Sequence, residues 1–74
     1  MSRYKFSVII EKDEDGYYAF VPELDGCYTQ GSTYGEVFER IQDAIRLNVE
    51  DKIACGEQIN QYERVSLTMV ELAV

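Results

Sequence analysis

The sequence contains no histidine and no tryptophan, and it has only two cysteines and one proline. A nucleophilic serine or cysteine needs a neighbouring base, and histidine, the usual base, is missing. A zinc site needs about four ligands, which two cysteines without histidine do not supply within one chain. None of the five glycines belongs to the G-x-x-x-x-G-K-S/T motif that binds phosphate. We therefore expect no catalytic residue, no metal and no cofactor, which leaves a binding protein.

Acidic residues are frequent enough to form neighbouring pairs, such as Glu23 with Asp25 and Glu50 with Asp51. Carboxylate pairs can act as general acid and base, but these fall in a predicted turn and on a predicted helix surface, where charged residues commonly face solvent. The acidic run 11–15 also fails as a calcium loop, which needs ligands at alternate positions and a bidentate glutamate at the twelfth. We therefore do not expect metal-dependent hydrolysis by this run.

Positive charge is also scarce, because seven basic residues stand against fourteen acidic ones and give a net charge of −7. A phosphate backbone would be repelled, so we expect no direct nucleic-acid binding, whereas a basic protein partner would be attracted. The first ten residues, MSRYKFSVII, have the pattern of neither a signal peptide nor a membrane span, so we expect a cytoplasmic location by default. In a reducing compartment, Cys27 and Cys55 are expected to be small buried hydrophobic residues rather than a disulfide.

The stretch from Gly16 to Glu36 organises the chain. Tyr17 to Val21 has the aromatic and aliphatic composition of a strand, which Pro22 ends. The next four residues, Glu23-Leu24-Asp25-Gly26, are typical of a chain reversal, and Cys27 to Gln30 then returns as a second strand. Thr33 and Glu36 have the spacing of a capping box, in which each side chain accepts from the backbone N–H of the other. A helix is expected to begin here.

Three further elements complete the expected fold. Tyr4 to Lys12 alternates as a first strand and joins the next strand through the charged turn 13–16. Apolar residues at spacings of three and four predict an amphipathic helix from Tyr34 to about Cys55-Gly56. Arg64 to Leu72 alternates again and is predicted to be a last strand.

We therefore predict a single α+β domain over residues 1–74, in which a three-stranded antiparallel meander is followed by one helix. A right-handed crossover would place the fourth strand parallel to the first. One helix covers only one face of such a sheet, so Ile9, together with either Tyr17 or the pair Tyr18 and Phe20, would lie on the uncovered face. Because an apolar patch of this kind usually marks an interface, we expect a homo-oligomer, most simply a two-fold dimer.

The segment DGYYAFVPELDGCYTQGSTYGE, followed by IQDAIRLNVED in the helix, resembles the HicB antitoxin family over residues 16–51. The resemblance implies a partial RNase H-like domain that binds and silences a HicA-type toxin, a small basic mRNA-cleaving enzyme. Two-metal catalysis of the RNase H type needs an acidic residue in the first strand, where this chain has Phe6, Ser7 and Val8, so we expect the fold without the reaction. Many relatives continue into a DNA-binding segment, whereas this sequence ends at Val74 with no basic segment or further helix, which argues against transcriptional autoregulation.

Residues of the matching motif are the candidates for contact with a partner, because aromatic anchors inside a charged rim are typical of interfaces. Without a toxin, the chain would instead be a solitary oligomeric binding module. The candidates for partner binding are Tyr17, Tyr18, Pro22, Glu23, Asp25 and Gly26, and those for the oligomer face are Ile9, Tyr18 and Phe20.

Overall fold

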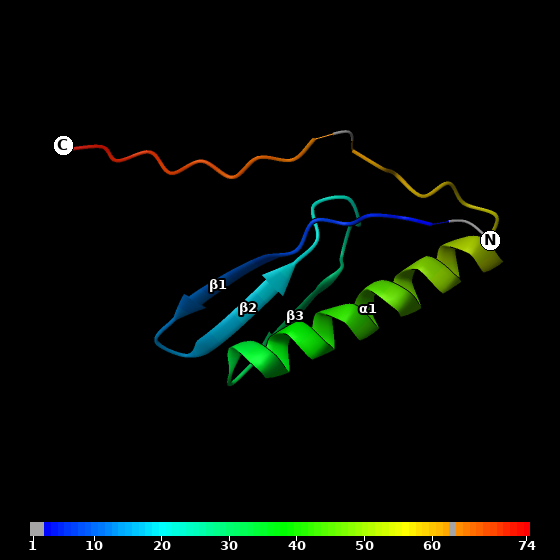
Figure 1. The fold of residues 1–74 in the computed structure, drawn as a ribbon, viewed down its shortest axis with the longest axis horizontal. Coiled ribbons are helices and arrows are strands. Elements are labelled where there is room, and N and C mark those ends of the chain that lie inside the picture. The colour runs from blue at the N-terminus through cyan, green and yellow to red at the C-terminus, as the bar shows by residue number, and fades with distance from the viewer. Residues whose placement is uncertain (1–2, 63) are drawn as a thin grey trace.

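The computed structural model describes residues 3–62 and 64–74. It contains three strands, β1 (Ile9–Asp13), β2 (Gly16–Phe20) and β3 (Tyr28–Gly31), and one helix, α1 (Tyr34–Ala54). The strands form an antiparallel sheet in the order β1-β2-β3, and the helix follows the last strand (Figure 1). The α+β class and the meander predicted from the sequence are confirmed.

The two connections within the sheet are short and are held by local hydrogen bonds. In the β1–β2 turn, the backbone N–H of Asp15 donates to Oδ1 of Asp13 over 2.9 Å. In the β2–β3 connection, Val21 N–H donates to the carbonyl of Cys27 over 3.1 Å. Gly26 takes a φ of +74°, a left-handed conformation that favours glycine. These bonds set the antiparallel register of the meander.

The helix begins where the sequence predicts, although its cap differs from the expected one in one bond. Thr33 Oγ1 accepts from the backbone N–H of Glu36 over 3.1 Å, as a capping box requires. The Glu36 carboxylate instead accepts from the N–H of Ser32 over 3.3 Å, and not from that of Thr33. The helix ends at Cys55 and Gly56, whose φ of +72° terminates it in the predicted place.

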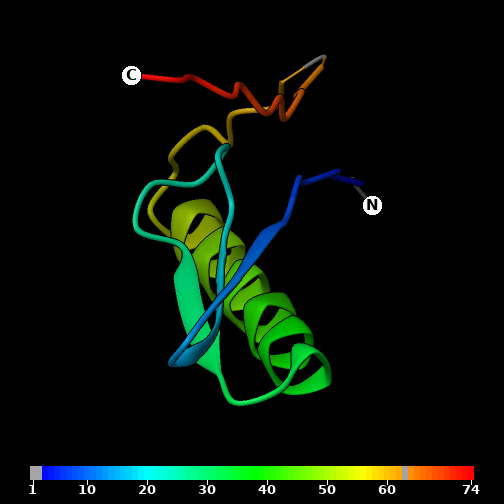
Figure 2. The same cartoon turned by 90° about the vertical axis from the view of Figure 1, so that its left-hand side faces the viewer.

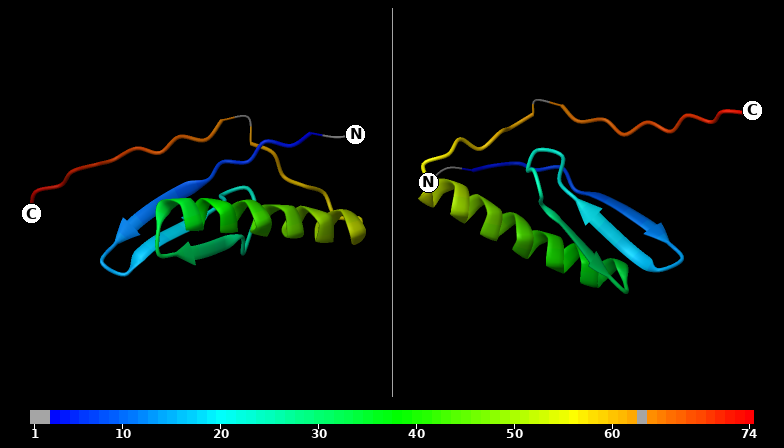
Figure 3. Two further views of the ribbon diagram at one scale, coloured as in Figure 1. Left: turned by 60° about the horizontal axis from the view of Figure 1, so that its bottom comes forward. Right: turned by 180° about the vertical axis from the view of Figure 1, so that it is seen from behind.

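The core lies between the helix and one face of the sheet. Figure 2 shows α1 lying across that face, and the two views in Figure 3 show the same arrangement. Ala19 of β2 and Val37 and Ile41 of α1 are fully buried. The β2–β3 connection closes one end of this layer, where its apolar residues Val21, Leu24 and Cys27 are also buried. The helix therefore covers a single face, and none of the helices and strands in residues 3–62 and 64–74 covers the opposite face.

The first strand is shorter than predicted, because residues 4–8 lie outside it. The pairing of Ile9 with Phe20 is the last in the register, and β2 ends at this point. Residues 4–8 therefore have no strand beside them, although Phe6 and Val8 still pack against the core.

The predicted fourth strand does not form in the single chain, because residues 64–74 lie in no strand or helix. The chain is held just before them by a pair of hydrogen bonds. Lys5 N–H donates to Oε1 of Gln61 over 2.9 Å, and Nε2 of Gln61 donates to the carbonyl of Lys5 over 2.8 Å. Beyond this point the segment runs apart from β1 (Figures 1 and 3). Within the described part of the chain the sheet therefore has three strands, and the RNase H-like arrangement is not confirmed.

The two cysteines differ in their surroundings. Cys27 is buried, as predicted, and burial raises the pKa of its thiol. Cys55 is exposed, which corrects the prediction, because it caps the helix at the end that extends beyond the sheet (Figure 1). Both cysteines are free.

Candidate protein-binding site

The sheet face without a helix is the candidate site, and we call it the open face. The pairing register fixes its members, because residues paired across antiparallel strands point to the same side and alternate along each strand. Ala19 is buried under the helix, so its neighbours Tyr18 and Phe20 point the other way. The strand residues of the open face are Ile9, Glu11, Asp13, Tyr18, Phe20, Tyr28 and Gln30.

Three aromatic side chains form the centre of the open face. The ring of Tyr18 lies 6.0 Å from that of Phe20 and 6.0 Å from that of Tyr28, measured between centroids. Tyr28 is 60% exposed, and Ile9 is paired with Phe20 at the edge of the cluster. Clustered aromatic side chains supply large contact areas at low entropic cost, so this cluster suits a protein interface.

The aromatic cluster continues into the β2–β3 connection. A shallow hollow of about 290 Å³ brings Tyr18, Phe20 and Tyr28 together with Pro22, Asp25 and Gly26. Four of the six predicted partner residues, Tyr18, Pro22, Asp25 and Gly26, therefore lie on one surface. The three predicted oligomer residues, Ile9, Tyr18 and Phe20, lie on the same face.

The other two predicted partner residues lie elsewhere. Tyr17 is on the helix-covered face, where its ring meets that of Tyr34 edge-on at 6.2 Å. Glu23 is only 5% exposed, and its Oε2 accepts from the backbone N–H of Ser7 over 2.8 Å. Its Oε1 has no hydrogen-bond partner among the described residues. The position of Glu23 suits a role in holding the N-terminal segment against the β2–β3 connection.

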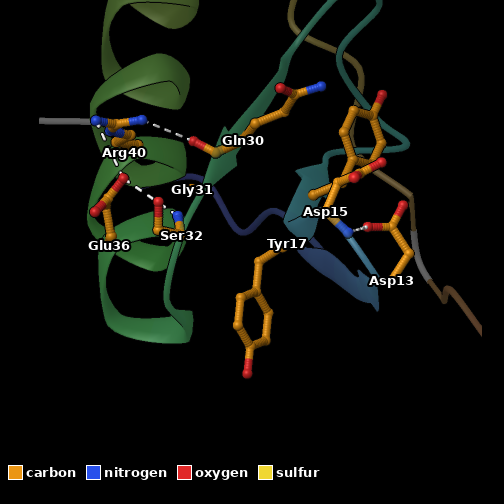
Figure 4. A pocket seen from close by; sticks show the side chains of 10 residues that line it. Asp13, Asp15, Tyr17, Gln30, Gly31, Ser32, Glu36 and Arg40 are labelled. Atoms are coloured by element: carbon orange, nitrogen blue, oxygen red, sulfur yellow. Dashed lines mark hydrogen bonds and ion pairs between the residues drawn. The ribbon is translucent and has the colours of Figure 1, made fainter.

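A second hollow, of about 390 Å³, lies at the end of the sheet near the β1–β2 turn (Figure 4). Asp13 and Asp15 line it from the turn, and Gln30 lines it from β3. Arg40 reaches it from the helix, where Nη1 donates to the carbonyl of Gln30 over 3.0 Å and Nη2 lies 3.2 Å from Oε1 of Glu36. The Arg40 guanidinium is thus already paired. Tyr18 lines both hollows, which makes them parts of one continuous surface.

The charges around the open face are mostly negative. Glu11, Asp13, Asp15 and Asp25 are all exposed along the strands and turns that border it. The chain as a whole carries a net charge of −7. Such a field speeds the encounter with a basic protein and disfavours an acidic one.

The described residues contain few of the other features that would indicate chemistry. Among residues 3–62 and 64–74, no three histidine, cysteine, aspartate or glutamate side chains come together as metal ligands. Within the same ranges, no helix has the length and apolar character of a membrane span. The buried thiol of Cys27, with its pKa raised by burial, is held in the neutral form, which is a poor nucleophile.

The sequence-based prediction missed Tyr28, which lies at the centre of the aromatic cluster. A signal for it was present in the alternation of the segment Cys27 to Gln30. If Cys27 faces the core, Tyr28 must face the opposite side. The fold and this face together define the class: a small α+β domain with an acidic, aromatic sheet face that its helix leaves uncovered.

Comparison with known proteins identifies the family. Residues 6–72 match the family described as HicB_like antitoxin of bacterial toxin-antitoxin system. A UPF0150 protein of Archaeoglobus fulgidus is 48% identical over 62 residues, covering 74% of this chain and 90% of the relative. A second UPF0150 protein, from Thermoplasma acidophilum, is 44% identical over 66 residues, covering 88% of this chain and 96% of its own. No solved structure matches. The chain belongs to the HicB-like antitoxin family.

Proposed function

We propose that this protein binds and inhibits a small basic mRNA-cleaving toxin of the HicA type, with the open face as the binding surface. Membership of an antitoxin family supports a role in a toxin-antitoxin system. The observation that carries the proposal for this chain is the cluster of Tyr18, Phe20 and Tyr28, left uncovered by the helix and bordered by carboxylates.

The arrangement fits inhibition by steric cover. The aromatic rings would provide the desolvated centre of the interface, and the acidic rim would complement lysine and arginine side chains of the toxin. A toxin that cleaves mRNA must attract phosphates, so its active surface is expected to be basic. An acidic partner that covers this surface competes with RNA for the same charges. No bond-making step by the antitoxin is required.

We further propose that the protein acts in the cytoplasm, makes no direct contact with nucleic acid and self-associates. The predicted oligomer residues Ile9, Tyr18 and Phe20 share the open face with the toxin candidates. One face cannot be covered by a second copy and by a toxin at the same time. The alternative function, a solitary oligomeric binding module, therefore uses this face for self-association instead.

A pull-down from the lysate of the native host separates the two functions. The tagged protein is expected to capture a small basic protein in stoichiometric amount at moderate salt and to release it at high salt. The captured protein should cleave mRNA alone and lose this activity when the antitoxin is restored. Recovery of the tagged protein alone, as an oligomer, would support the solitary module.

Two substitutions locate the interface once the toxin is in hand. Tyr28→Ala is expected to weaken binding about 30-fold or more, the size of a typical hot spot. Asp25→Lys should slow association, whereas Glu50→Lys on the exposed helix surface makes the same change in net charge and serves as its control. Equal effects of the two charge reversals would show that net charge alone, and not the open face, governs binding.

A further inference from the structure

The last residues of the chain form an exposed apolar segment, which we call the C-terminal arm (residues 64–74). Its sequence, RVSLTMVELAV, has the alternation and β-branched content of a strand. Leu67, Met69 and Val70 are 63%, 87% and 85% exposed. Exposure of several neighbouring large apolar side chains is unfavourable in water and usually marks a contact surface. The arm thus has the composition of a strand without the pairing of one.

The sheet has a free edge that such a strand would fit. In the order β1-β2-β3, strand β1 pairs with β2 on one side only, so its other side presents unpaired backbone groups among the described residues. Free edges of this kind readily accept a further strand. The nine residues 64–72 would span about 30 Å when extended, enough to follow the whole of β1.

The side chains along this edge match the arm on both faces. Ile9 lies on the open face, whereas Ile10 is on the helix side, where it packs against the core and remains half-buried. The helix packs on β2 and β3, which leaves the helix side of β1 only partly covered. The arm likewise has apolar residues on both of its faces, with Leu67 and Met69 on one and Val70 and Leu72 on the other. A strand with two apolar faces suits a position beside β1.

Within its own chain, the arm does not take this position. Gln61 is fixed to Lys5 by two hydrogen bonds, and the hydroxyl of Tyr62 donates to the carbonyl of Pro22 over 3.4 Å. From there the arm runs in the same general direction as β1 but at a distance from it, and it pairs with none of the described strands (Figures 1 and 3). Exchange of an element between identical copies is a low-cost route to a dimer, because each copy donates one arm and accepts one.

We propose that the C-terminal arm of one copy pairs with the free edge of β1 in a second copy, and that two copies exchange arms around a two-fold axis. Each sheet then gains the fourth strand that the sequence pattern predicts, supplied by the partner. The exchange buries the arms and leaves the open face free for a toxin. The inference is independent of the toxin, because it requires only two copies of this chain.

Sedimentation of the purified full-length protein tests the proposal. The wild type is expected to sediment at about 17 kDa at micromolar concentration, twice the chain mass of 8.5 kDa. The double variant Leu67→Asp, Met69→Asp places charge on one face of the arm and should sediment as a monomer. The matched control, Leu47→Asp with Ile53→Asp, makes the same change at exposed positions of the helix and should remain a dimer. A wild type that is monomeric, or an arm variant that stays dimeric, would overturn the proposal.

Amide hydrogen exchange of the wild type gives a test that does not depend on a variant. In the dimer, the amides of residues 64–72 should exchange slowly, and dilution below the dissociation constant should make them exchange fast while β2 stays protected. Slow hydrogen exchange of these amides in a monomer would place the arm on β1 of its own chain and contradict the exchange of arms between two copies. If Tyr28→Asp dissociates the dimer and the variant Leu67→Asp, Met69→Asp remains dimeric, self-association would be assigned to the open face instead.

Discussion

The packing of α1 on β3 depends on the absence of a side chain at Gly31. A Cβ atom at this position would lie 2.8 Å from the backbone nitrogen of Val37 and 3.1 Å from its Cα. Contacts below 3.0 Å with backbone atoms require the structure to move. Val37 is fully buried in the first part of the helix, so the helix itself would have to shift away from the sheet in Gly31→Ala.

The expected cost follows from two opposing effects. Overpacking of a well-packed site costs about 1–3 kcal/mol, whereas replacing glycine by alanine recovers about 0.4–1 kcal/mol from the lower entropy of the unfolded chain. The net loss is about 1–2 kcal/mol. A domain of this size has only about 3–5 kcal/mol of stability from its core, so Gly31→Ala removes a large part of it.

Thermal and urea denaturation at one fixed protein concentration measure this loss. The melting temperature is expected to fall by about 4–8 °C for each kcal/mol. Gly35→Ala is the matched control, because a Cβ there meets nothing within 4 Å and the residue is helical. That variant should gain up to about 1 kcal/mol. If Gly31→Ala proves as stable as the wild type, the helix does not pack on β3 as closely as described.

Three further predictions concern the motif, the cap and the thiols. Glu23→Ala leaves the partly buried backbone N–H of Ser7 without its acceptor and should lower the free energy of unfolding, measured in urea, by about 1–3 kcal/mol. Asp25→Ala, at an exposed position nearby, should change it by no more than about 0.5 kcal/mol. Thr33→Ala should cost about 1 kcal/mol and lower helicity in circular dichroism; no change would rule out the cap. A thiol reagent at neutral pH should modify Cys55 and not Cys27 until the protein is unfolded. Burial raises the pKa of the Cys27 thiol above its ordinary value of 9.0, so the folded state disfavours the thiolate. The free energy of unfolding should therefore keep its full value below pH 9.0 and fall as the pH rises through the raised pKa. Cys27→Ala should abolish this loss.

Much of the candidate site was predictable because it depends on strand alternation. Tyr18, Pro22, Asp25 and Gly26 lie within nine residues of one another, and local turn chemistry brings them to one side of the sheet. The assignment of Tyr17 to the opposite face needed the register, since alternation alone does not say which of two adjacent tyrosines faces the helix. Glu23 was unpredictable for another reason: its partner, the N–H of Ser7, is sixteen residues away.

The elements that rest on local interactions could be predicted from the amino-acid sequence. The capping threonine at position 33, the glycine at position 56 and the apolar periodicity between them define the helix, and Gly16 and Gly26 mark the two connections of the meander. Tertiary structure decided what depends on distant groups: where β1 begins, which face the helix covers, and whether residues 64–72 find a strand to pair with. A strand pattern in the sequence predicts that a segment can pair but does not say with which segment, because the backbone hydrogen bonds of a strand are made with another strand. Among the described residues of the single chain, no segment pairs with the arm, whereas the helix satisfies its own backbone and forms where the sequence predicts it.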